Sequence, residues 1–188
     1  MLPVYRNAVV MDPILQQLQR EIGGSLQGLD ATQTQLRPST ANSDKDKWSI
    51  QQIAQHLTLT YANTEIAING RLAKGTPTRT QPTLQQRIRQ YAVTTLGYFP
   101  RGREAPSSVC PPACSPPLSG EELTQEATIG LARIDQLFAQ AESLFGSRRA
   151  ISHVVLGPLS IYQWRRFHLI HGRHHIRQIR AIRTAHRN

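Results

Sequence analysis

The amino-acid sequence predicts an all-α protein, an antiparallel four-helix bundle with an extra short helix and a long proline-rich connection. Three observations lead to this prediction. Apolar residues recur at helical spacing in four long stretches of the chain. Four of the five expected helices begin with serine or threonine followed three residues later by glutamine or glutamate, which is the capping-box pattern. The alternation of apolar and polar residues that marks a half-buried strand hardly appears.

The first two helices are expected over residues 12–37 and 49–74. Asp12 and Pro13 form an N-cap followed by a proline at the first helical position. The apolar residues behind them keep a helical period as far as Pro38, which ends the helix. Ser49 with Gln52 forms the capping box that opens the second helix.

Three further helices are expected over residues 83–99, 119–146 and 160–186. Residues 100–118 contain six prolines, so they are expected to form a long irregular connection. Cys110 and Cys114 lie in this connection and indicate neither a disulfide framework nor a second metal site. We find no internal repeat and no second domain, so one domain is expected over 1–188.

The composition fits a soluble protein with an uneven charge. No apolar run is long enough to span a bilayer and the N-terminus lacks a signal-peptide pattern, so a cytoplasmic location without membrane contact is expected. The formal net charge is +10, and from Ser147 onward there are nine arginines and no acidic residue. Such asymmetry makes a basic nucleic-acid-binding helical protein the alternative function. The stretch lacks interleaved exposed aromatic residues and any recognisable reading motif, so nucleic acid remains the less favoured partner.

Two histidines of the last helix form a pattern typical of metal ligands. His171 and His175 are one helical turn apart, with about 40° between them around the helix axis, so both imidazoles can bind one cation. His56 lies within the second helix and is the only histidine among the first 150 residues, which makes it the candidate third ligand. Two other interpretations stay open at this point: a solvated histidine-rich turn, or core histidines bonded to backbone carbonyls.

The arginines of the last helix lie at least about 120° from His171 by the same count. We therefore expect a histidine face turned toward the core and an arginine face turned toward solvent. Leu169 and Ile176 interrupt the arginine face and could form a homodimer contact.

Short motifs at these positions resemble a known group of helical proteins. Trp48 precedes the helix that carries His56 and Leu57, and the last helix contains the run His-Gly-Arg-His-His at 171–175. Together with segments 156–160 and 164–168, this pattern resembles the DinB/YfiT-like superfamily over about residues 12 to 186, most weakly over 75–118. The resemblance implies a four-helix bundle of the DinB/YfiT type that binds a divalent metal through one histidine of the second helix and two of the last. Carried over by position, the ligands are His56, His171 and His175.

Three neutral imidazoles leave the charge of the ion uncompensated and at least one coordination position open, which is typical of a catalytic site. The ion could be zinc or nickel, both of which suit imidazole ligands. The resemblance implies a metal-dependent enzyme, such as a thiol S-transferase that uses a low-molecular-weight thiol like bacillithiol or mycothiol; a hydrolase acting through a bound water is the other route. A small-molecule substrate is expected, and related bundles are often homodimers.

Six further side chains complete the predictions. His168, Thr60 and Asn63 are the candidates for lining a substrate pocket, with His168 also open to a role as a fourth ligand or as core packing. His174 is expected to bond a neighbouring helix, and His153 and His186 are expected to lie on the surface.

Overall fold

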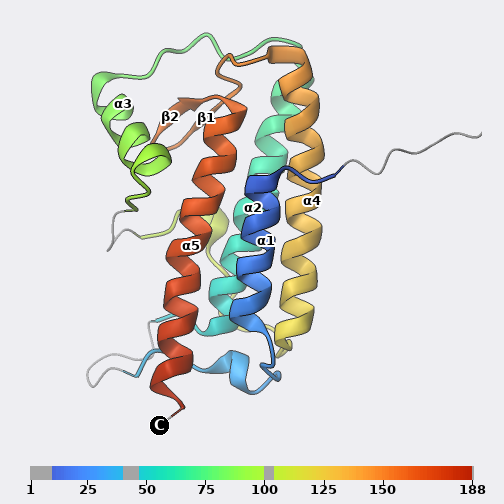
Figure 1. Cartoon of the computed structure of the whole chain (residues 1–188), viewed down its shortest axis with the longest axis vertical. Helices are drawn as coiled ribbons and strands as arrows, with labels where there is room; N and C mark the ends of the chain where they lie inside the picture. Colours follow the sequence, from blue (N-terminus) through green and yellow to red (C-terminus); the bar gives the residue numbers. More distant parts are fainter. Residues whose placement is uncertain (1–9, 40–46, 100–103, 188) are drawn as a thin grey trace, which may run out of the picture.

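A computed structural model of the chain describes residues 10–39, 47–99 and 104–187. Four long helices lie side by side and form the body of the protein (Figure 1). They are α1 (Pro13–Leu26), α2 (Ile50–Leu72), α4 (Gly120–Phe145) and α5 (Ile161–Ala185). The prediction of a mostly helical protein is therefore confirmed. None of the described helices is both long enough and apolar enough to cross a bilayer.

The helices are not all antiparallel to their neighbours, and in this respect the prediction is wrong. Asp12 at the start of α1 pairs with Arg165 near the start of α5, while Arg183 near the end of α5 donates to the Ser25 carbonyl near the end of α1. These two helices therefore run in the same direction, and α2 and α4 run together in the opposite direction (Figure 1). A parallel pair of neighbours cannot be joined by a tight turn. The chain between α2 and α4 must return along the length of α2, which has 23 residues and is therefore roughly 35 Å long.

The helix starts agree with the sequence patterns, whereas two helix ends do not. The Ser49–Gln52 capping box and its counterparts at the starts of α3, α4 and α5 make both expected hydrogen bonds. The first helix ends at Leu26 and not near residue 37, because the backbone turns away at Gln27, with a ψ of 130°, and Gly28 follows with a φ of 75°. Beyond it the chain forms a loop with a short 3-10 turn, η1 (Gln33–Gln35).

A small substructure that includes an unexpected hairpin lies beside the start of α5 (Figure 1). Two short antiparallel strands, β1 (Ile151–His153) and β2 (Gly157–Leu159), replace the expected loop. The short helix α3 (Leu84–Gln90) passes into a π-helical turn, η3 (Tyr91–Thr95), and does not continue as a helix to residue 99. The side-chain amide of Gln90 donates to the carbonyls of Leu156 and Pro158, so α3 is fastened to the hairpin.

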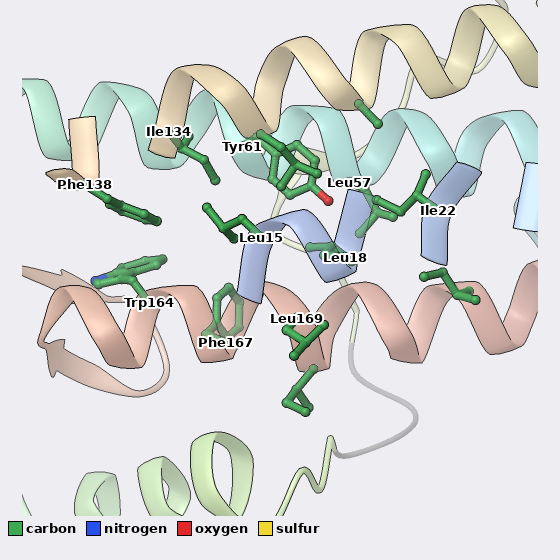
Figure 2. Close-up of a cluster of buried hydrophobic side chains, with 14 of the residues drawn as sticks. Leu15, Leu18, Ile22, Leu57, Tyr61, Ile134, Phe138, Trp164, Phe167 and Leu169 are labelled. Atoms are coloured by element: carbon green, nitrogen blue, oxygen red, sulfur yellow. The ribbon is translucent and has the colours of Figure 1, made fainter. Parts of the chain in front are cut away.

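The core fills the space between the four long helices. Figure 2 shows Leu15 and Leu18 of α1 and Tyr61 of α2 beside Phe167 and Leu169 of α5. Leu169 and Ile176 are 1% and 2% exposed, so these two residues pack inside the protein and cannot form the expected dimer contact.

Arg165 of α5 is also turned inward and Arg173 is half-buried, contrary to the expected solvent face, whereas Arg177, Arg180 and Arg187 are exposed as expected. Arg165 is 6% exposed and pairs with Asp12 and Glu142, at 3.4 and 2.7 Å, with Asp135 at 3.8 Å. Arg173 bonds Glu21 of α1 through two nitrogens. α5 contacts α1, α2, α4 and the hairpin. Neighbouring elements therefore cover more of its surface than the single buried face that the sequence predicted.

Candidate metal centre

The three histidines predicted as ligands lie together, although His56 is more than a hundred residues away from the other two in the sequence. The Nε2 atom of His171 lies 3.2 Å from Nε2 of His56 and 3.0 Å from Nε2 of His175. Two nitrogens bound to one tetrahedral ion at the usual distance of about 2.05 Å would lie roughly 3.3 Å apart. One nitrogen from each ring falls within 4.8 Å of the others, so a single divalent ion could contact all three.

The outer ring nitrogens determine the orientation of two of these imidazoles. Nδ1 of His56 lies 2.8 Å from the Val109 carbonyl oxygen, and Nδ1 of His175 lies 2.8 Å from Oε1 of Gln178. A carbonyl oxygen accepts and cannot donate, so both Nδ1 atoms carry the proton. Both Nε2 lone pairs therefore face the third histidine. This arrangement, with the second nitrogen donating to an oxygen, is the one usually found behind metal-binding histidines.

Close helix packing and aromatic walls hold the third ring. Gly172 follows His171, and a Cβ at that position would lie 2.3 Å from a methyl carbon of Leu18, so glycine lets α1 approach α5 here. The ring of Phe167 stacks on His171 at 5.3 Å between centroids and 8° between planes, and Phe99 lies 5.1 Å away. The ring of Trp48 lies 4.9 Å from that of His56 and is tilted by 40° from its plane.

Burial keeps all three imidazoles neutral. It lowers the pKa of His175 to about 3 and the pKa of His171 well below its usual value, and nearby histidines lower both further. Burial also lowers the pKa of His56, against the opposing effect of its bond to Val109. A metal competes with protons for these nitrogens, so neutral rings at physiological pH suit metal binding.

The histidine cluster opens into a cavity of about 1010 Å³ that extends to the hairpin. Thr60 and Asn63 line this cavity, as the sequence predicted. Both are held in place, because the Thr60 hydroxyl donates to the His56 carbonyl and Asn63 donates to Ser108. The long proline-rich connection includes a short 3-10 turn, η4 (Ser107–Val109), which closes one side of the site.

His168 is not part of the cavity wall formed by the described residues, so the pocket-lining prediction fails for it. Its ring is 0% exposed and packs against Tyr61, Phe138 and Trp164. Neither ring nitrogen bonds any described residue, and burial lowers its pKa to about 3. His168 is a neutral core residue.

His153 is one of two cavity histidines that the sequence did not place in the cavity; the other is His174. His153 was expected on the surface, yet it lines the cavity from strand β1, and burial lowers its pKa to about 4. Ile151 before it and Val154, Val155 and Leu156 after it are apolar, which is the signal that could have indicated a buried segment here. His186 is exposed as expected. The ring of His174 lies 5.0 Å from Phe99 and 5.1 Å from His175, and its Nε2 bonds Gln178 of its own helix.

Cys110 lines the cavity next to Val109, and both cysteines are exposed free thiols.

Comparison of the chain with protein-family models, with curated proteins and with solved structures finds no match.

Proposed function

We propose that this chain binds one divalent metal ion through His56, His171 and His175 and uses it to act on a small molecule. The observation that carries the proposal is the convergence of three Nε2 atoms, two of them aimed by Nδ1–H bonds to carbonyl oxygens. Zinc and nickel are the metals of choice, because both accept neutral imidazoles readily. A divalent ion held by three neutral ligands would keep a position open and supply Lewis acidity to a thiol or a water.

We further propose membership of the DinB/YfiT-like superfamily. One ligand comes from α2 and two, four residues apart, come from the last helix, which is the ligand pattern that the sequence resemblance implies. On this proposal the chemistry is thiol S-transfer, with hydrolysis as the second route. The homodimer expectation now depends on the resemblance alone, since Leu169 and Ile176 are buried.

The nucleic-acid alternative has lost support. Arg165 and Arg173 are engaged by carboxylates of the same chain, and Arg183 donates to backbone carbonyls of α1 and the loop that follows it. Arginines held in this way are less available to phosphate groups.

Metal binding is tested by elemental analysis of the purified protein after incubation with zinc or nickel and gel filtration. We expect about one ion per chain, lost in His171→Ala because two nitrogens bind far more weakly than three. His186→Ala is the matched control, since it removes an exposed histidine of the same region. Equal metal content in the two variants, or no uptake by the unaltered protein, would contradict the proposal.

The reaction is tested on metal-loaded protein with a low-molecular-weight thiol and an electrophile, alongside an ester without thiol. Thiol consumption that disappears in His171→Ala supports S-transfer, whereas ester cleavage with the same dependence supports hydrolysis. Turnover that survives the loss of metal would exclude both.

A further inference from the structure

The cavity beyond the histidines has predominantly apolar walls. Five aromatic side chains line it: Trp48, Tyr98, Phe99, Trp164 and Phe167. Apart from histidines, the charged residues in the described wall are Lys47, Arg89 and Glu104, of which Lys47 and Glu104 are exposed and Arg89 is half-buried. A volume of about 1010 Å³ with such walls suits a drug-sized apolar molecule.

His153 places an uncharged hydrogen-bond donor in this largely apolar wall. Its Nδ1 accepts the backbone N–H groups of Val155 and Leu156, at 3.0 and 3.1 Å. A nitrogen that accepts cannot carry the proton, so in the neutral ring the proton is on Nε2. This assignment rests on two backbone donors whose role is not in doubt, because an amide N–H can only donate.

The environment of the ring leaves that donor available. No described residue accepts a hydrogen bond from Nε2 of His153. This atom does not belong to the fully buried, unbonded polar atoms of the described chain, so a ligand can reach it. The ring itself is held by Phe167 at 4.5 Å and Trp164 at 5.5 Å. Phe167 also stacks on His171, so one aromatic ring separates the donor from the metal centre.

We propose that the cavity binds an uncharged, largely apolar small molecule with a carbonyl-type oxygen that accepts the Nε2–H of His153. A neutral donor in an apolar wall favours a neutral acceptor, since a carboxylate would have to give up its hydration without meeting a positive charge at this position. The direction of the molecule, with its reactive end toward His56, His171 and His175, rests on the proposed metal function. Binding itself does not.

Three naphthalenes of similar shape test the proposal: 2-acetylnaphthalene, which has the acceptor; 2-isopropylnaphthalene, which has none; and 2-naphthoate, which is charged. The two tryptophans of the chain both line the cavity, so quenching of tryptophan fluorescence reports occupancy. We expect the ketone to bind about threefold to tenfold more tightly than the hydrocarbon, as one net hydrogen bond allows, and more tightly than the carboxylate.

His153→Asp removes the donor while retaining the turn, because an aspartate oxygen can accept the same two backbone N–H groups and a carboxylate donates none. This variant should bind ketone and hydrocarbon equally, with an unchanged circular dichroism spectrum. His174→Asn, at a second cavity histidine, should retain the preference. Equal binding of the three probes by the unaltered protein, tightest binding of the carboxylate, or a preference that survives in His153→Asp would overturn the proposal.

The titrations are made on metal-free and on zinc-loaded protein. Ketone binding without any metal uptake would support the proposed ligand site and contradict the proposed metal-dependent function. Metal uptake without a ketone preference would do the reverse.

Discussion

Four of the seven histidines are buried, and burial has the same effect on each ring but a different use. The Nε2 atoms of His56, His171 and His175 lie close together, so a neutral ring there could serve as a metal ligand. His168, one turn before His171 on α5, has no partner for either nitrogen within the described chain. Its buried, unbonded nitrogens therefore lower the free energy of unfolding. The two cases are adjacent on one helix and differ in what faces the ring.

Replacing His168 with leucine, a side chain of similar volume, should raise the free energy of unfolding at pH 7.5 by about 1 kcal/mol, because two unsatisfied buried nitrogens disappear. It should also flatten the acid dependence. The unfolded chain takes up a proton at His168 below about pH 6.5, whereas the folded chain does so near pH 3, so stability falls as pH drops through this window. One histidine contributes at most about 1.4 kcal/mol per pH unit to that slope. Urea titrations at pH 7.5, 6 and 5 measure both effects; an unchanged slope would contradict them.

Gln178 should act on the metal without touching it. Its side-chain oxygen accepts the proton of His175 Nδ1, so Gln178→Leu frees that ring to rotate and to change tautomer. Zinc affinity should fall about 10-fold to 100-fold, measured by competition with a chromophoric chelator. Arg177→Leu, at the exposed neighbouring position, should leave the affinity within twofold, about 0.4 kcal/mol.

Among the helices, α5 combines the largest number of roles. It carries two of the proposed ligands, packs its apolar residues into the core, and pairs Arg165 with three carboxylates. Burial raises the pKa of Asp135, whereas its bond to the Asp12 amide and the charge of Arg165 lower it. The charged form of Asp135 is therefore stabilised in part by Arg165.

Arg165→Met should therefore leave a group of acidic residues without its cation, at a cost of about 3 kcal/mol in the free energy of unfolding. Arg177→Met, on the exposed side of α5, should change stability by less than about 0.5 kcal/mol. Chemical denaturation of both variants is the measurement. Similar stabilities would show that the arginine is dispensable.

The same helix shows how far the sequence could predict this protein. The four capping boxes and the His171–His175 pair follow from residues within one turn of each other, and the structure has them as predicted. A helical projection gives angles around one axis but not the number of neighbours that the helix has. Arg165 and Ile176 were placed on an outer face for this reason, and both are buried.

The errors elsewhere have a similar origin. Strand β1 has three residues, too few to show alternation, and the hairpin is bonded to Gln90 of α3, which is distant in sequence. His153 could not be placed without that hairpin. The direction of α4 relative to α2 is set by packing between segments distant in sequence, which no local pattern records.

For the molecule as a whole, the connection between α2 and α4 does more than join two parallel helices. Gln51 of α2 bonds Ser115, Pro116 and Leu118, and Val109 accepts the Nδ1 proton of His56. The connection is thus attached to the side of the bundle on which the histidines meet.

Metal should therefore protect this connection from proteolysis. Binding to the folded state alone stabilises it by about 4 kcal/mol at a metal concentration a thousand times the dissociation constant. Cleavage within residues 104–118, followed by mass spectrometry, should slow on addition of zinc to the unaltered protein and to His186→Ala. In His171→Ala zinc should have no effect, and equal protection there would show that the metal acts elsewhere.

The distance along the chain between His56 and His171, 115 positions, also governs when the centre can exist. During synthesis His56 leaves the ribosome long before its partners are made. Helix α2 can form early, but closing so long a loop is entropically costly, and the apolar contacts that offset this cost come from α4 and α5. A nascent chain would therefore offer a metal only one of the three imidazoles until α5 is made, and the three-histidine centre forms only once the long helices have packed together.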